Sequence, residues 1–299
     1  MLKRYIINNR LRVEKMKTLI VSEPTLVVGN SIEEVKEGLF LLREYIQSGN
    51  SLIYLTNRPS DCITPVGGVV SIDGSVSFKY AAKQKEALGL EVLIEQEKNN
   101  INLGDLQYNY AVFGNGALIF DAFDKLIYER YLEKDIIEEV TKILIKNGYA
   151  DNPNPIFLQI AQQAFIKYYK SNIGVLEKKE SSKIYGFQGY IPSSIRRNDV
   201  ANEQLCQLLE TSDLGLKAWV LNNMPCIYNA ASSKEIAIEW LISNKLIDPN
   251  DMRLIVGEIT DLGLSEAYPE LTYVVDSNEN FLQGIRKEKS LVKVLEKIL

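Results

Sequence analysis

The sequence contains no histidine, and this absence removes several kinds of active site at once. A Ser-His-Asp triad, a Cys-His pair and a histidine-ligated zinc site all need an imidazole ring. The three cysteines, Cys62, Cys206 and Cys226, are odd in number and widely spaced. This pattern argues against a disulfide framework and favours a reducing, cytoplasmic setting. Chemistry here must therefore rest on carboxylates, lysine, hydroxyl groups or a hard cation such as magnesium.

Long apolar runs and an excess of basic residues are also lacking. No run approaches the roughly 20 apolar residues that cross a bilayer, and the first residues carry neither the apolar segment nor the cleavage site of a secretion signal. The net charge of −5 offers no basic footprint for nucleic acid. We therefore expect a protein that contacts neither a membrane nor nucleic acid.

The composition that is present suits a folded domain of some size. The chain has 299 residues, of which 46% are hydrophobic and 24% are charged, values that are ordinary for a globular protein with a sizeable core. Residues 1–16 precede the first strand-like stretch, and we interpret them as an N-terminal extension. The length allows one large domain or two modest ones.

Short apolar runs alternate with amphipathic stretches in the two ends of the chain. Each run is strand-like, and helical spacing follows at residues 31–46, 232–241 and 291–298. Strand-helix-strand order implies parallel strands with right-handed crossovers. We therefore predict an α/β fold, a Rossmann-like doubly wound parallel sheet, with strands near 18–22, 52–55, 110–113, 253–256 and 272–275.

The middle of the chain has a different, mixed texture. Antiparallel-looking strands and two amphipathic helices fill residues 122–229, which suits a smaller α+β domain. We expect this segment to be an inserted cap, with 17–121 and 230–299 forming the core domain. A further hairpin is expected at 63–79, because Asp73-Gly74 separates two β-rich runs.

Three polar clusters should meet at the carboxyl end of the predicted sheet, where ligands bind in such folds. Thr56 and Asn57 follow the second strand, where a hydroxyl group and backbone amides can hold a phosphate oxygen. Lys234 begins a helix and can place an ammonium against phosphate. Glu258 and Asp261 follow the fourth strand, and paired carboxylates there suit Mg²⁺.

These residues carry a resemblance to a known family. The runs Lys17-Thr18-Leu19-Ile20-Val21-Ser22, Leu55-Thr56-Asn57-Arg58-Pro59, Gly114-Asn115-Gly116-Ala117-Leu118-Ile119-Phe120-Asp121 and Ser233-Lys234-Glu235-Ile236-Ala237 resemble the haloacid dehalogenase (HAD) superfamily. The Cof-type branch, which includes sugar phosphatases and sucrose-phosphate phosphatase, is the most similar. The resemblance runs from Lys17 to Leu299 and implies a cap inserted between the threonine and lysine motifs.

The resemblance also implies roles for individual residues. Matched to the family's Asp-x-Asp-Gly-Thr motif, the nucleophile position falls on Glu23 and the acid/base position on Thr25. Thr56, Asn57, Asn115 and Lys234 match phosphate- or substrate-binding positions. Glu23, Glu258 and Asp261 match the metal-binding positions, and because both motif aspartates are replaced we expect Mg²⁺ binding to be weak or absent.

Three functions stay open after this matching. The first is a catalytically eroded relative that binds a phosphosugar, or a protein partner, with little or no phosphatase activity. The second is an active Mg²⁺-dependent phosphoric monoester hydrolase of sugar phosphates that uses Glu23. The third is a structural or interaction module whose cleft is vestigial, and assembly with a protein partner or as a homo-oligomer also stays open. Retention of Thr56, Asn115 and Lys234 favours the first, and loss of both aspartates disfavours the second.

Overall fold

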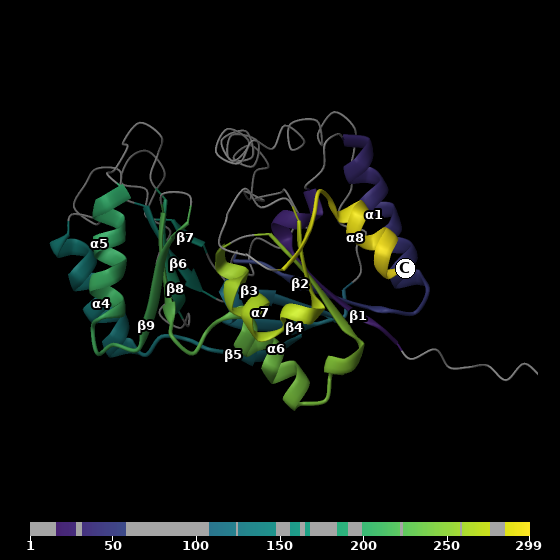
Figure 1. Ribbon diagram of the computed structural model, residues 1–299. Helices are drawn as coiled ribbons and strands as arrows, with labels where there is room; N and C mark the ends of the chain where they lie inside the picture. The colour runs from purple at the N-terminus through teal and green to yellow at the C-terminus, as the bar shows by residue number, and fades with distance from the viewer. Residues whose placement is uncertain are drawn as a thin grey trace, which may run out of the picture.

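Figure 1 shows the computed structural model of the chain. It describes residues 16–27, 32–57, 108–123, 125–147, 156–161, 165–167, 184–190, 199–221, 224–257, 259–275 and 285–299. The predicted hairpin at 63–79, residues 1–15 of the predicted extension, and Glu258 lie outside these residues. Two β-sheets organise the described part, one with eight strands and one with five.

The larger sheet is mostly parallel, with β1 at its centre. Its strand order is β13-β12-β11-β1-β2-β3-β4-β5, and every neighbouring pair from β13 to β3 is parallel, whereas β3–β4 and β4–β5 are antiparallel. The strands are β1 Thr18–Ser22, β2 Ser51–Leu55, β3 Tyr110–Phe113, β4 Leu118–Asp121, β5 Leu126–Glu129, β11 Met252–Val256, β12 Thr272–Val275 and β13 Arg286–Glu288. The predicted doubly wound α/β class is confirmed, and all five predicted strands are present.

Helices cover both faces of this sheet (Figure 1). Leu19 and Val21 of β1 pack with α1 (Ile32–Gln47) and α8 (Leu291–Ile298). Ile20, between them, packs with residues of α6 (Lys234–Ser243) and α7 (Leu262–Ala267) on the other face. Because side chains alternate along a strand, a run buried throughout has to feed two cores. Short 3-10 helices are η1 Glu23–Val27, η4 Gly114–Gly116, η5 Pro249–Asp251, η6 Ile259–Asp261 and η7 Pro269–Leu271.

The five-stranded sheet is antiparallel in the order β7-β6-β8-β10-β9. Ala218 and Ile227 pack against helices α4 and α5. Trp219 and Tyr228, one residue further on, pack against the larger sheet. The elements are α4 Lys134–Lys146, β6 Ile156–Ala161, β7 Phe165–Lys167, β8 Ile184–Tyr190, α5 Asp199–Glu210, β9 Leu216–Leu221 and β10 Met224–Asn229.

One strand inside the predicted insert belongs to the larger sheet. β5 falls within 122–229, yet it pairs antiparallel with β4. The pairing can form because the turn after Asp121 is tight: Asp121 Oδ1 accepts hydrogen bonds from the Phe123 and Lys125 amides at 2.9 and 3.0 Å. On hydrogen-bonding grounds the proposed cap would begin after β5. The division into core and cap domains remains a proposal.

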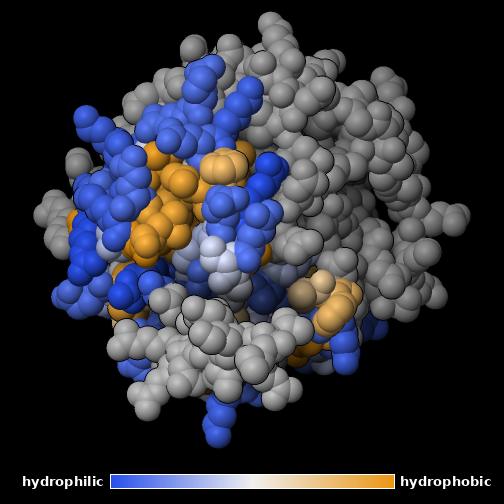
Figure 2. All heavy atoms as spheres, turned by 90° about the vertical axis from the view of Figure 1, so that its right-hand side faces the viewer, coloured by the Kyte–Doolittle hydropathy of each residue, from blue (hydrophilic) through white to orange (hydrophobic). Residues whose placement is uncertain are grey.

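The surface over α1 and α8 carries an apolar strip. Phe40 is 58% exposed and Leu299 is 59% exposed, and Figure 2 shows hydrophobic residues bordered by hydrophilic ones on this side of the molecule. Within the described ranges, the helices are too short or too polar to cross a bilayer.

Candidate functional site

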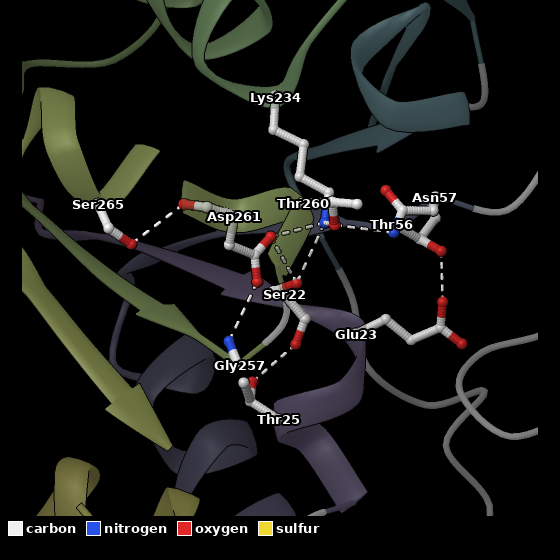
Figure 3. Close-up of polar contacts among 10 residues, drawn as sticks. All are labelled: Ser22, Glu23, Thr25, Thr56, Asn57, Lys234, Gly257, Thr260, Asp261 and Ser265. Atoms are coloured by element: carbon white, nitrogen blue, oxygen red, sulfur yellow. Dashed lines mark hydrogen bonds and ion pairs between the residues drawn. The ribbon is translucent and has the colours of Figure 1, made fainter. Parts of the chain in front are cut away.

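Polar side chains from four segments meet beyond the carboxyl end of β1 (Figure 3). They come from β1 and η1, from the residues after β2, from the start of α6, and from the segment after β11 that runs through η6 into α7. β2 and β11 flank β1 on either side, so the segments that follow these three strands are brought together. The residues drawn are Ser22, Glu23, Thr25, Thr56, Asn57, Lys234, Gly257, Thr260, Asp261 and Ser265.

A fully buried ion pair lies at the centre of this cluster. Lys234 Nζ and Asp261 Oδ1 are 2.6 Å apart, and both side chains have 0% exposure. The ammonium also donates to Thr260 Oγ1 at 3.2 Å and to Ser22 Oγ at 3.4 Å. Ser233 caps α6 by accepting the Ile236 amide at 3.3 Å, which fixes the start of the helix that presents the lysine.

Both oxygens of the Asp261 carboxylate accept hydrogen bonds from within the protein. Oδ1 accepts from Lys234 and, at 3.1 Å, from Ser22 Oγ. Oδ2 accepts from the Gly257 amide at 3.0 Å. Ser265 Oγ donates to the Asp261 backbone carbonyl at 3.0 Å, which ties η6 to α7. The predicted Lys234 and Asp261 positions are thus brought together.

Ser22 was not among the site residues expected from the sequence. Its side chain lies in the cluster with 0% exposure and contacts both members of the ion pair. The alternation of side chains along β1 could have identified it, because Ser22 lies on the same face of the sheet as Ile20, and α6 covers that face. Matching by residue type alone passed over this serine and selected Glu23.

Glu23 and Thr25 point elsewhere. The Glu23 carboxylate, 8% exposed, accepts a hydrogen bond from the Thr56 hydroxyl. The Thr25 hydroxyl donates to the Ser22 backbone carbonyl at 2.6 Å. A Cβ at Gly257 would lie 2.8 Å from the Thr25 methyl carbon, so this threonine packs against the residue that follows β11, a neighbour of β1 in the sheet.

Asn57 links the cluster to the smaller sheet. Its amide nitrogen donates to Thr260 Oγ1 at 2.9 Å. The Tyr228 hydroxyl, on β10, donates to the Asn57 backbone carbonyl at 3.2 Å. The smaller sheet therefore contacts the cluster directly at the residue after Thr56.

Asn115 lies close to the start of α6 because of its neighbour Gly116. Gly116 has a φ of +92°, and a Cβ there would overlap the Ser233 carbonyl oxygen. Asn115 itself is left-handed at a φ of +53°, a conformation that asparagine tolerates better than most residues. Its amide donates to the Thr56 carbonyl at 3.3 Å, so the Asn115 and Thr56 segments are joined.

No family model matches the sequence, and no curated protein matches it. Solved structures do. A haloacid dehalogenase-like hydrolase from Bacteroides thetaiotaomicron has a TM-score of 0.64 at 10% identity, covering 95% of this chain and 100% of that one. A HAD/Cof-like hydrolase from Plasmodium vivax has a TM-score of 0.63 at 13% identity, covering 96% and 97%. The chain has the HAD hydrolase fold.

A HAD subclass IIB sugar phosphatase is also similar, with a TM-score of 0.59 at 11% identity over 95% of this chain and 98% of that one. The fold expected from the resemblance is confirmed. At these identities the likeness concerns the HAD fold, and the roles expected for Glu23, Thr25, Thr56, Asn57, Asn115, Lys234 and Asp261 stay predictions.

The magnesium expected for the HAD fold can be tested against the donors present. Mg²⁺ needs oxygen ligands in near-octahedral array. Here both Asp261 oxygens accept from internal donors, one of them a lysine ammonium, and Glu23 accepts from Thr56. No group of three or more His, Cys, Asp or Glu side chains in the described part of the chain suits a metal ion. The predicted ligand Glu258 lies outside the described residues, so the expected weak or absent binding of Mg²⁺ stays a prediction.

Proposed function

We propose that this HAD-fold protein binds a phosphorylated small molecule, a sugar phosphate in the first place, and hydrolyses it slowly or not at all. The observation that carries the proposal is the Lys234–Asp261–Ser22 cluster, in which a buried ammonium is matched to a carboxylate whose oxygens are both engaged. The sugar is suggested by the sugar phosphatase among the structures of the same fold.

The Thr56 end of the site supports anion binding. The Thr56 hydroxyl already donates to an anionic oxygen, that of Glu23. A phosphate oxygen has the same chemistry, so a phosphate group would compete with the Glu23 carboxylate for this donor. The Lys234 ammonium, with its other contacts to Ser22 and Thr260, provides positive charge within the same cluster.

The same cluster supports slow or absent turnover. Phosphoryl transfer to an enzyme needs a nucleophile together with a group that takes up and returns a proton. Ser22, whose Oγ accepts a hydrogen bond from Lys234 Nζ, offers a hydroxyl group rather than a carboxylate as nucleophile. Thr25 donates its hydroxyl to a backbone carbonyl and has no group that titrates near neutral pH.

An active phosphatase that uses Glu23 is the second candidate. The observation in its favour is that the Glu23 carboxylate lies at hydrogen-bond distance from Thr56, so a phosphate held by that threonine would lie near a nucleophilic oxygen. Its side chain is one methylene longer than aspartate, and misplacement by about 1 Å can cost on the order of 10²-fold in rate.

Calorimetric titration with hexose phosphates, paired with an assay for released orthophosphate, tests the proposal. We expect saturable binding in buffer containing a chelator, and no release above background when Mg²⁺ is supplied instead. A chain that binds no hexose phosphate under either condition contradicts the binding function. Release at about 1 s⁻¹ or faster, within the usual enzyme range, contradicts the loss of turnover.

A further inference from the structure

A cavity of about 310 Å³ opens beside the polar cluster, where the two sheets meet. This volume lies at the lower end of the range of about 300–1,000 Å³ that is typical of small-ligand sites. The larger sheet's layer contributes residues from η4, α6, η6 and α7, and the smaller sheet's layer contributes residues from α5 and β9. The polar lining that matters for recognition is Asn115, Glu210, Lys217, Trp219, Glu235 and Glu266.

The cavity is negatively charged. Among the described lining residues, three carboxylates, those of Glu210, Glu235 and Glu266, stand against one ammonium, that of Lys217. Lys217 Nζ is 3.8 Å from Glu235 Oε1, and its side chain is 47% exposed. A cleft lined mainly by one sign of charge concentrates ligands of the other sign. The cavity therefore favours a cationic group over a second anionic one.

Two of these carboxylates are held in place. Glu210 Oε1 accepts the Ala218 amide at 3.2 Å, which orients the carboxylate at the end of α5. The Glu235 carboxylate lies over Gly263, where a Cβ would be 2.5 Å from its carboxyl carbon. This carboxylate also lies 3.8 Å from the Lys217 ammonium.

Buried polar atoms in the lining also call for a ligand. Asn115 is only 3% exposed, and its Oδ1 has no hydrogen-bond partner among the described residues. Within the same described part, the buried Trp219 Nε1 has no acceptor. Buried polar groups are nearly always bonded, and leaving one unbonded costs about 1–3 kcal/mol. An ammonium or hydroxyl group would satisfy Asn115, and a hydroxyl oxygen would satisfy Trp219.

Thr260 joins the cavity to the polar cluster. It lines the cavity, and its Oγ1 accepts hydrogen bonds from Lys234 at 3.2 Å and from Asn57 at 2.9 Å. A ligand in the cavity therefore lies next to the cluster, while Lys234 and Thr56 themselves are buried behind the lining. The side of the ligand toward Thr260 suits a phosphate, and the side among the glutamates suits an amine.

We propose that the ligand is an amine-bearing sugar phosphate, an aminosugar phosphate, whose ammonium group is recognised by Glu210, Glu235 and Glu266 and whose hydroxyl groups reach Asn115 and Trp219. This rests on the proposed function for the phosphate end only. Recognition of the amine would distinguish aminosugar phosphates from plain hexose phosphates, which carry no amine.

The test is calorimetric titration of the full chain with three probes: glucosamine 6-phosphate, glucose 6-phosphate and glucosamine. We expect glucosamine 6-phosphate to bind about tenfold more tightly than glucose 6-phosphate, the effect of one favourable charge contact of about 1.4 kcal/mol. Glu210→Gln, which keeps the acceptor for the Ala218 amide, should cut this ratio severalfold because it removes a charge that favours only the amine-bearing ester. Glu203→Gln, an exposed change on the same helix, is the matched control.

The outcomes separate the two proposals. Equal binding of the two phosphate esters, or a ratio that Glu210→Gln does not change, overturns the amine recognition and leaves the proposed function standing. Binding of glucosamine without binding of either phosphate ester supports the amine recognition and overturns the phosphate-binding function. Binding of none of the three probes overturns both.

Discussion

Lys234 and Asp261 form an ion pair in which both charged groups are buried away from water and contact each other. Taking both charges out of water is costly, and the mutual attraction has to offset that cost. The geometry here is close, at 2.6 Å, with Ser22, Thr260 and the Gly257 amide supplying further hydrogen bonds. A pair of this kind depends on both partners being present.

The Asp261→Asn change should therefore destabilise the fold strongly. It removes the negative charge beside a lysine of 0% exposure, and breaking a buried pair from one side typically costs about 3–5 kcal/mol. The double change Lys234→Met with Asp261→Asn removes both charges and should cost less than the single change. Urea unfolding measures both, and a double variant less stable than Asp261→Asn would contradict this account.

Burial of the Cys206 thiol should make the free energy of unfolding depend on pH in the alkaline range. Burial, together with Glu210 and Glu203, raises the pKa of its thiol from 9.0 to about 12. The folded pKa lies above the unfolded one, so the unfolded chain releases its proton first. The stability contributed is complete below about pH 9 and is lost as pH rises toward 12.

We therefore expect the free energy of unfolding to fall between pH 9 and pH 11, and to fall less steeply in Cys206→Ala. Tyr45 has its pKa raised to about 12 by burial, so a smaller decline should persist in that variant. Chemical unfolding at a series of pH values gives both slopes. Identical slopes for the two proteins would show that the thiol does not contribute.

At the scale of elements, the apolar runs predicted the strands well because a buried parallel sheet needs them. The strands at 110–113 and 272–275 have the predicted bounds, and α8 matches its predicted range. The pairing of β5 with β4 could not be predicted, because a short antiparallel strand has the same sequence pattern whether it joins the larger sheet or the smaller one. Ser22 was missed because a residue-type match ignores the face on which a side chain lies.

The η4 turn offers a test at this scale. Gly116 combines a φ of +92° with a site where Cβ would overlap the Ser233 carbonyl, whereas Gly49 has a φ of +84° and open space around it. Gly49→Ala should cost about 1 kcal/mol from backbone strain alone. Gly116→Ala should cost at least about 2 kcal/mol more, since the start of α6 must move. Equal losses in thermal or urea unfolding would contradict this close approach.

For the whole molecule, the two sheets act together at the site. Trp219 and Tyr228 stack with ring centroids 5.4 Å apart, and both pack in a cluster with β3 and β4. The same tyrosine bonds to Asn57, and the same tryptophan lines the acidic cavity. The proposed cap thus shapes the cleft, which is the part of the site that motif matching in the core segments could not anticipate.

The Glu23→Ala variant separates the two candidate functions, because one predicts tighter binding of glucose 6-phosphate and the other predicts loss of phosphate release. In our account Glu23 competes with phosphate for Thr56. Removing one nearby negative charge should tighten glucose 6-phosphate binding about tenfold. The exposed change Glu37→Ala on α1 controls for net charge.

The decisive measurement is calorimetric binding of glucose 6-phosphate to wild type and Glu23→Ala, with orthophosphate release followed in the presence of Mg²⁺. We predict tighter binding by the variant and no release above background from either protein. Wild-type release at about 1 s⁻¹ or faster that disappears in Glu23→Ala would contradict this account and establish Glu23 as the nucleophile of an active phosphatase.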